Sequence, residues 1–278
     1  MITSIVVALD GSPYGEAARE HAVELARAYD ARVVGLAVAD VRLLEMSPLM
    51  GATFPGEAQP VDPLPMQLFE SYRQAGERTL EAFRAAVDAA GVPVEVRLDE
   101  GVPSKVIAEV GDAFDLIVMG RRGAQAKFTQ DLLGSTTEAL VRRAGTPVLL
   151  VGESYRRIQN ALLLFDGSRA ANHALKLAAD VCRATGWSLR VLTVGDDPAH
   201  TGPILEEARG YLEGAAYPCD FRVREGEPVF AVLEELEEAP ADLVLMGMQG
   251  HSFLHDLILG STTEQLMREI DVPLLLAP

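Results

Sequence analysis

The feature that most constrains the fold of this chain is an internal repeat. Residues 5–12 form an apolar run that ends in Asp-Gly-Ser, and residues 161–168 repeat it at an offset of 156 residues. Residues 115–120 are matched by residues 242–247 at an offset of 127 residues. The same unit therefore occurs twice, and a chain of 278 residues is long enough for two domains that each bury a core.

The two copies differ in length. Because the offset falls by 29 residues between the two matches, the second copy lacks most of a segment that we place at residues 41–70. This segment is rich in Pro, Gly and Met, which predicts a loop or lid. We expect one domain over residues 1–153 and a shorter one over residues 158–278, with a short polar join between them.

Apolar runs alternate with stretches of helical periodicity in both copies. Residues 16–29 and 172–185 carry apolar side chains at spacings of three and four, whereas residues 33–38 and 189–194 are short and β-rich. Alternating β and α elements predict a parallel sheet. Runs that are apolar at every position, such as residues 116–119, fit strands covered by helices on both faces. The predicted fold class is α/β, with two doubly wound parallel-sheet domains.

Charge and composition exclude several classes of function. The chain has 24 basic and 41 acidic residues, and a net charge of −17 would repel the backbone of a nucleic acid. No window approaches 18 consecutive apolar residues, and the amino terminus resembles a first strand rather than a signal peptide. Cys182 and Cys219 lack a CxxC partner, so neither a zinc site nor a redox pair is indicated. We expect a cytoplasmic protein with no membrane partner.

Asp10 and Asp166 each end the first strand of their copy. In an open α/β sheet, ligands bind beyond the carboxyl ends of the strands, where the strand order reverses. A carboxylate there can accept hydrogen bonds from a ribose or orient a metal-bound water. It can also cap the following helix, because Asp is a good N-cap residue, and an isolated Asp favours that interpretation.

A glycine pattern gives a stronger signal. Each copy has a GxxG loop after a buried strand, and then Gly-Ser-Thr before a helix. Nine residues separate Gly250 from Gly260 in the second copy, and ten separate Gly123 from Gly134 in the first. Glycine lets the backbone approach a phosphate closely, and a helix N-terminus offers unpaired N–H groups to an anion. Neither GxGxxG nor GxxxxGK[ST] occurs, so the dinucleotide fingerprint and the P-loop are both absent.

These motifs, with residues 7–12 and the strand Thr-Pro-Val-Leu-Leu-Val at residues 146–151, resemble the universal stress proteins over nearly the whole chain. In that family the pattern GxxG-x9-G-(S/T) marks an ATP-binding branch. The resemblance implies an adenine nucleotide alpha hydrolase-like, Rossmann-like fold and a bound adenine nucleotide, ATP being the first choice, with or without Mg²⁺. The residues that it assigns to the nucleotide are Asp166, Gly247, Gly250, Gly260, Ser261 and Thr262 in the second copy, and Asp10, Ala37 or Val38, Gly120, Gly123, Gly134, Ser135 and Thr136 in the first.

The first copy departs from the family pattern by the extra residue in its loop, and the second copy has a much shorter connection after Thr193-Val194. The resemblance also implies a pseudo-dimer within one chain, because family members commonly pair through their last strands. Residues 145–151 would pair with residues 272–277, each being an apolar edge that sheets usually avoid exposing. A homodimer of the whole chain stays open.

Other polar residues carry weaker signals. His251 and His255 lie four residues apart, as metal ligands on a helix do, but no third ligand is evident, so we predict no metal site. Arg121, Arg122 and Lys127 lie in the loop of the first copy, where they would either grip phosphate or stay solvated. The run Glu-Glu-Leu-Glu-Glu at residues 234–238 predicts an exposed acidic helix end.

The sequence offers no catalytic residues by local motif, since no GxSxG elbow and no nucleophile with an evident base occur. Phosphoryl transfer needs mainly positioning and charge neutralisation, and Asp10 and Asp166 are the motif-linked carboxylates that would serve it. We therefore expect an ATP-binding regulatory protein of the stress response. The alternatives are a slow Mg²⁺-dependent ATPase and a structural module that binds protein partners and no nucleotide.

Overall fold

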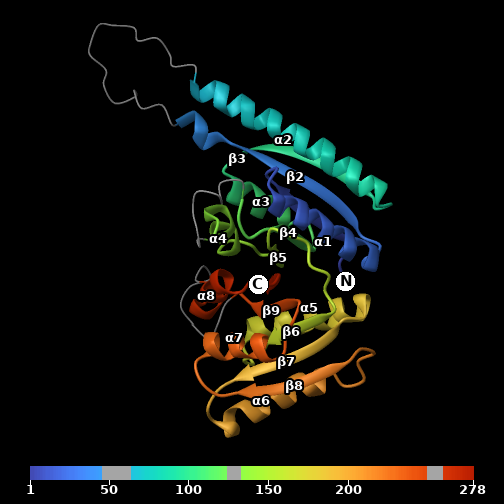
Figure 1. Cartoon of the computed structure of the whole chain (residues 1–278), viewed down its shortest axis with the longest axis vertical. Coiled ribbons are helices and arrows are strands. Elements are labelled where there is room, and N and C mark those ends of the chain that lie inside the picture. The colour runs from blue at the N-terminus through green and yellow to red at the C-terminus, as the bar shows by residue number, and fades with distance from the viewer. Residues whose placement is uncertain (46–63, 124–132, 249–258) are drawn as a thin grey trace, which may run out of the picture.

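The computed structural model describes residues 1–45, 64–123, 133–248 and 259–278. These residues form one ten-stranded sheet in the order β3-β2-β1-β4-β5-β10-β9-β6-β7-β8 (Figure 1). Each half contributes five parallel strands with the same doubly wound order, which confirms the predicted fold class. The strands are β1 (Ser4–Leu9), β2 (Arg32–Asp40), β3 (Val94–Gly101), β4 (Leu116–Gly120), β5 (Val148–Val151), β6 (Asn160–Leu164), β7 (Ser188–Val194), β8 (Cys219–Arg224), β9 (Leu243–Gly247) and β10 (Leu274–Ala277).

Helices cover both faces of the sheet. One core cluster lies beneath α1, α2, α5 and α6, and the other lies beneath α3, α4, α7 and α8, so each core runs through both halves. Strands buried on both faces explain the runs that are apolar at every position. The helices are α1 (Pro13–Tyr29), α2 (Leu64–Ala89), α3 (Pro103–Gly111), α4 (Ser135–Val141), α5 (Arg169–Thr185), α6 (Pro198–Tyr211), α7 (Pro228–Glu238) and α8 (Ser261–Glu269), with a 3-10 turn η1 (Val41–Glu45).

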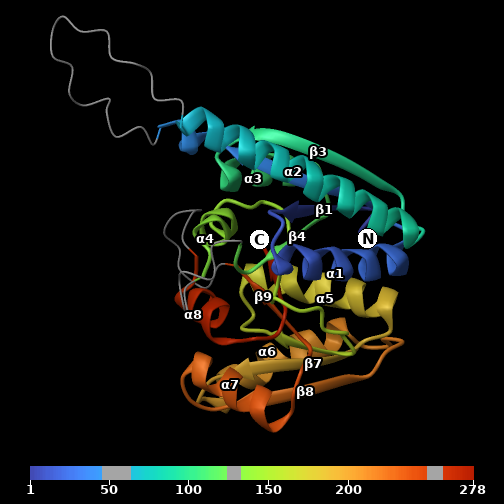
Figure 2. The ribbon, with the colours of Figure 1, turned by 45° about the horizontal axis from the view of Figure 1, so that its top comes forward.

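The two halves meet along their last strands. β5 and β10 pair antiparallel, with Leu149 opposite Leu275, whereas the pairs within each half are parallel. This pairing confirms the predicted contact between residues 145–151 and 272–277. Figure 2 shows α1 and α5 side by side across the same junction, where Tyr29 donates a hydrogen bond of 3.0 Å to Asp180. The two domains thus form a pseudo-dimer in one chain.

The extra length of the first half is distributed differently from our expectation. Residues 41–45 form η1 and residues 64–70 already belong to α2, so both ends of the predicted loop or lid are helical. The rest of that segment, residues 46–63, lies outside the described residues. α2 has 26 residues, whereas its counterpart α6 has 14 and follows β7 after only Gly195–Asp197. The sequence interpretation missed this because Pro and Met near residue 64 begin a helix as readily as they occupy a loop.

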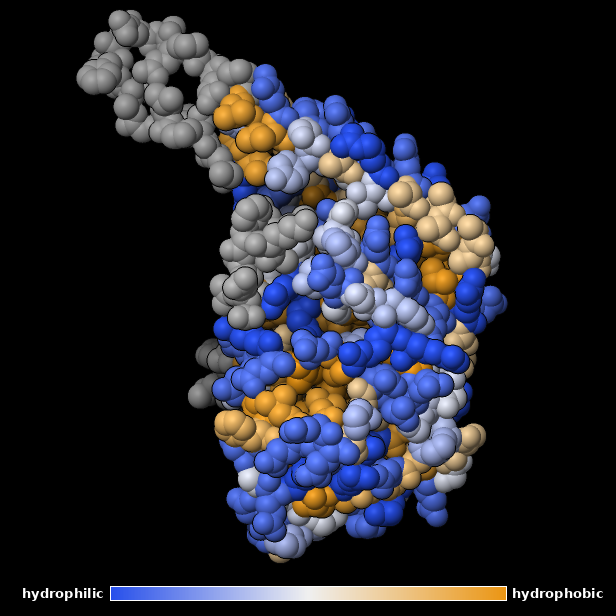
Figure 3. All heavy atoms as spheres, in the orientation of Figure 1, coloured by the Kyte–Doolittle hydropathy of each residue, from blue (hydrophilic) through white to orange (hydrophobic). Residues whose placement is uncertain are grey.

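The long helix α2 lies close to the sheet because of two glycines. A Cβ atom on Gly35 of β2 would lie 2.6 Å from the Phe83 ring, and one on Gly76 of α2 would lie 3.1 Å from Leu98. Figure 3 shows a largely hydrophilic face with apolar side chains gathered at the start of α2. The large apolar side chains exposed there are Leu64, Met66, Leu68 and Tyr72.

The acidic run at the end of α7 is only partly exposed. Glu235 has no exposed surface, and its carboxylate lies 2.5 Å from Nε of Arg224, 3.2 Å from Arg222 and 3.3 Å from Arg190. The prediction of an exposed acidic helix end is therefore wrong for this residue. Successive helical residues turn by about 100°, so one member of the run faces the sheet and meets the arginines of β7 and β8.

Candidate functional site

The strand order reverses between β1 and β4 in the first half and between β6 and β9 in the second. Asp10 follows β1, and Gly120 is the last residue of the neighbouring β4. Asp166 and Gly247 have the same relation at the ends of β6 and β9. Both candidate sites therefore lie at the carboxyl edge of the sheet, at the switch point where α/β folds hold their ligands.

Asp10 does not cap the helix that follows it. The N-cap of α1 is Ser12, whose side chain accepts a hydrogen bond from the backbone N–H of Gly15. Asp10 Oδ1 in turn accepts from the backbone N–H of Ser12 at 3.1 Å and from its hydroxyl at 2.6 Å. Ser168 caps α5 in the same way, and its N–H donates to Asp166 at 2.9 Å. The capping interpretation of the two aspartates is thus replaced by a serine cap, and each turn fixes the carboxylate at the strand end.

The GxxG loop of the first half lies directly against this carboxylate. A Cβ atom on Gly123 would lie 2.5 Å from Oδ2 of Asp10, so a side chain there would displace the aspartate. A Cβ on Gly120 would lie 2.5 Å from Cβ of Tyr14, in the first turn of α1. In this half, the glycines are therefore required by close approach between the loop after β4 and the loop after β1.

The helices that follow the glycine loops begin without a side-chain cap. Gly134 is the N-cap of α4 and Gly260 is the N-cap of α8, and neither has a side-chain cap hydrogen bond. In α8 the first residues, Ser261 and Thr262, are exposed and half-buried, and Ser135 and Thr136 occupy the same positions in α4. A helix start of this kind leaves backbone N–H groups available to an anion.

A threonine ties each helix start to its neighbouring strand. Thr137 donates a hydrogen bond of 3.2 Å to the carbonyl oxygen of Gly120, and Thr263 donates one of 3.3 Å to that of Gly247. A Cβ on Gly134 would lie 3.3 Å from the carbonyl oxygen of Arg121, so the helix start and the GxxG loop are in contact. Sequence reasoning did not single out these threonines, although their repetition at an offset of 126 residues is a usable signal.

The remaining predicted residues fall in different places. Ala37 pairs with Leu9, so Val38 lies level with Asp10 at the carboxyl end of β2, on the sheet face covered by α3. Thr193 of the second half is buried and donates to the carbonyl oxygen of Phe165, which leaves Val194 as the counterpart of Val38. The structure thus brings Asp10, Gly120, Gly123 and Gly134 together. Four other residues of the sequence analysis lie outside the described residues: Lys127, Gly250, His251 and His255.

Arg121 does not face the candidate site of its own half. Its side chain is 8% exposed and crosses into the second half, where Nη1 and Nη2 donate to the carbonyl oxygens of Ile270 and Val272, the latter at 2.7 Å. Burial lowers the pKa of the Arg121 guanidinium to about 10. The sequence interpretation that Arg121 either grips a nucleotide phosphate or stays solvated is wrong, because the residue bridges the two halves.

Four charged residues also connect the helices that begin at the two candidate sites. Arg142 of α4 contacts Glu138 at 3.0 Å and Glu264 of α8 at 3.2 Å. Arg268 of α8 contacts Glu264 at 2.9 Å and Glu138 at 3.8 Å. The offset of 126 residues relates the two pairs, so this ion-pair square lies on the pseudo-twofold axis of the molecule.

In the described part of the chain, no three His, Cys, Asp or Glu side chains cluster in a way that would hold a metal ion. None of its helices combines the length and the apolar character needed to cross a membrane.

Comparison with known proteins gives a consistent result for both halves. Residues 1–152 and 157–278 each match the model of the Universal stress protein family. A universal stress protein of Synechocystis sp. is 27% identical over 282 residues, a match that covers 98% of either chain. A universal stress protein of Methanocaldococcus jannaschii is 32% identical over 149 residues, covering 53% of this chain and 80% of that one.

Solved structures agree at the level of the fold. The crystal structure of a universal stress protein from Archaeoglobus fulgidus superimposes with a TM-score of 0.76 at 23% sequence identity. The match covers 99% of this chain and 97% of that one, so it includes both halves and their arrangement.

Proposed function

The chain belongs to the universal stress protein family, and we propose that it binds an adenine nucleotide, ATP first, at one or both of its switch points. The observation that carries this proposal is the contact between Gly123 and Asp10. The loop leaves no room for a Cβ atom beside the carboxylate at the end of the strand. It therefore presents backbone without side chains to a ligand in the crevice. Such a surface suits the phosphates and ribose of a nucleotide.

The first half offers a contact to each part of a nucleotide. The exposed start of α4 and the loop residues after Arg121, whose own N–H donates to Val151, offer backbone N–H groups to the phosphates. Asp10, fixed by Ser12, offers its carboxylate to the ribose hydroxyls or to a phosphate-bound Mg²⁺. Val38 lies level with Asp10 and provides an apolar surface for the adenine.

The second half repeats these parts with Asp166, Gly247, Gly260, Ser261 and Thr262. Its connection after β7 is only three residues, Gly195–Asp197, so the base would be less covered there. The proposed role is regulatory binding in the stress response rather than turnover. No observation on the described residues favours the ATPase alternative.

The test begins with the purified full-length chain. The protein is denatured, any released nucleotide is identified by chromatography and mass spectrometry, and ATP is titrated calorimetrically into nucleotide-free protein. We expect one or two ATP per chain. Binding would also be visible in melting, since ligand at one hundred times its Kd stabilises the fold by about 2.7 kcal/mol.

Variants assign the sites to the halves. Gly123→Ala should abolish the first site by pushing Asp10 aside, and Gly260→Val should abolish the second by crowding the start of α8. Gly210→Ala is the matched control, because a Cβ on that helical glycine meets no atom within 4 Å. No released nucleotide and no heat with ATP, ADP or AMP would leave the structural alternative, and Mg²⁺-dependent turnover lost with Asp10→Asn would favour the ATPase.

A further inference from the structure

A cavity of about 560 Å³ lies between the two halves, and neither Asp10 nor Gly123 is among the described residues that line it. Its walls come from the start of α1, the loop after β4, the chain that joins the halves, and the segment from α8 to β10. Cavities of this size hold small molecules in many proteins. The volume is thus sufficient for a metabolite, and the chemistry of the wall indicates which kind.

The innermost charged group of the wall is Arg121. Its side chain is more than nine-tenths buried, and Nη1 and Nη2 are held by the carbonyl oxygens of Ile270 and Val272. Nε is buried and has no hydrogen-bond partner among the described residues. The nearby carboxylate of Asp271 acts on the guanidinium electrostatically, although the two form no direct ion pair in the described part of the chain. Buried charges are normally compensated, and the positive charge of this arginine favours an anion in the adjoining cavity.

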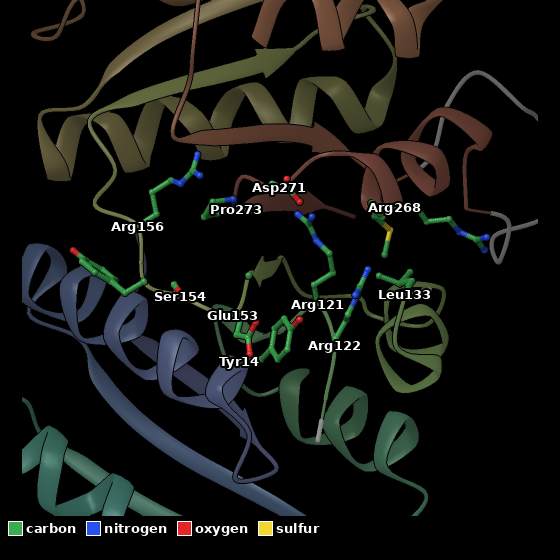
Figure 4. Close-up of a pocket in the computed structure, with 13 residues that line it drawn as sticks. Tyr14, Arg121, Arg122, Leu133, Glu153, Ser154, Arg156, Arg268, Asp271 and Pro273 are labelled. Carbon is green, nitrogen blue, oxygen red and sulfur yellow. The ribbon is translucent and has the colours of Figure 1, made fainter. Parts of the chain in front are cut away.

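The other charged side chains of the wall add to this positive charge. Arg122 and Arg156 also line the cavity and form no ion pair with the described residues, whereas Arg268 is paired with Glu264. The acidic side chains of the wall are Glu153 and Asp271. Figure 4 shows Arg121 and Arg122 extending from the loop toward the second half, while Arg268 points away from them. Locally the wall is positive, in a chain whose net charge is −17.

The corresponding place on the other side of the β5–β10 pair is built differently. The repeat puts Met248 where the first half has Arg121, and Ala170 where it has Tyr14. Met248 is buried and brings no charge to its position. The cationic wall therefore belongs to one side of the pseudo-dimer. A residue that served only to hold the repeated fold together would be expected in both halves.

We infer that this cavity is a binding site for a small metabolite anion with one or more phosphate or carboxylate groups. Guanidinium groups bind such oxyanions with charge-assisted, often two-pronged hydrogen bonds. Arg121 supplies a buried positive charge, and Arg122, which is half-buried, supplies a guanidinium without an ion-pair partner among the described residues. The site differs from the proposed nucleotide crevice, because neither Gly123 nor Asp10 is among the described residues that line the cavity.

The test titrates inorganic pyrophosphate and, separately, citrate into the full-length protein by calorimetry. At least one should bind once per chain. Arg122→Gln, which copies the residue of the second half, should weaken binding at least tenfold. Arg121→Met, which copies Met248, should do the same, and it is interpreted only where its melting curve shows a folded protein. Arg143→Gln, an exposed arginine outside the cavity, should change the affinity less than twofold.

Competition separates this site from the nucleotide crevice. Pyrophosphate or citrate bound in the cavity should stay bound in the presence of saturating ATP. If ATP displaced the probe and Arg122→Gln had no effect on its affinity, the probe would be bound at the glycine loops of the nucleotide crevice. The inference would then be wrong. It would also fall if neither probe bound at millimolar concentration, whereas the absence of ATP binding would leave it standing.

Discussion

The two halves of the chain share a sheet order and a candidate site but differ in what surrounds them. Both have a serine-capped helix after a strand-end aspartate, a glycine at the end of the neighbouring strand, and an uncapped helix start. They differ in the helix over the outer strands, which has 26 residues in α2 and 14 in α6. The switch-point geometry is thus retained while the covering layer and the buried polar residues change.

The buried polar residues show this difference most clearly. Counted from the proline that begins each helix, Glu235 of α7 corresponds to Val110 of α3. His21 of α1 corresponds to Leu177 of α5, and Arg121 corresponds to Met248. Each half therefore has buried polar groups that the other replaces with apolar ones, and the two halves should respond differently to mutation, pH and salt.

The largest effect is expected from Glu235→Ala. Removing the buried carboxylate leaves Arg190, Arg222 and Arg224 without their shared partner, which should lower the free energy of unfolding by about 3 kcal/mol. Denaturant unfolding followed by hydrogen exchange should place the loss in the second half. Glu234→Ala, on the exposed side of the same helix, is the control. Equal losses for the two variants would contradict the structural role of Glu235.

A pH effect should distinguish α1 from α5. Burial lowers the pKa of His21 from 6.5 to about 4, so the unfolded chain binds a proton more readily than the folded one. Stability should therefore be full above about pH 6.5 and decline as the pH falls toward 4, by about 2 kcal/mol between pH 7 and pH 5.

The matched variant is His21→Leu, which copies Leu177. It should flatten that part of the pH dependence in thermal or urea unfolding, because no buried imidazole is left to titrate. His200→Leu, at an exposed position in α6, is the control variant. A pH profile for His21→Leu that parallels the unmodified protein would remove His21 as its source.

The serine caps should have smaller and unequal effects. Ser12→Ala and Ser168→Ala each remove an N-cap, which costs about 1 kcal/mol in the free energy of unfolding. The loss should be greater for Ser12, because its hydroxyl also donates to Asp10 at 2.6 Å. Ser154→Ala, an exposed serine in the join, serves as the control in urea titrations. A greater loss for Ser168 would argue against the Asp10 contact.

The smallest effect is expected in the ion-pair square between α4 and α8. Arg142→Ala and Arg268→Ala should each lower stability by about 0.5 kcal/mol, because their ion pairs are about one-third exposed. The two losses should be equal within error and should shrink in 1 M NaCl, where screening is strong. Arg143→Ala provides the control. A salt-independent loss would point to packing rather than charge.

Much of the sheet could be predicted from the sequence because the strands are apolar on both faces. The repeat located β1, β4, β6 and β9, and the apolar runs at the ends of the two copies predicted the β5–β10 pair. The start of α2 was missed, since propensity alone does not separate a helix from a Pro-containing loop at residues 64–70. No local sequence pattern indicated which half of the molecule a given loop contacts.

The candidate site was predicted in its residue types but not in its contacts. The motifs indicated Asp10 and the glycines, while the serine caps and the threonine links became apparent only in three dimensions. Arg121 and Glu235 were misinterpreted for one reason. Their burial depends on partners 149 residues away in one case and on the neighbouring strands in the other, and neither partner is visible in a local window.

The β5–β10 pair has a consequence for how the molecule behaves on dilution. Two separate subunits joined at such a pair would dissociate as their concentration fell, whereas here the join holds the second half at a high effective concentration beside the first. An isologous homodimer must also duplicate every contact of its interface. A fused pair need not, so a single buried arginine at one end of the interface and a methionine at the other are compatible with one stable assembly.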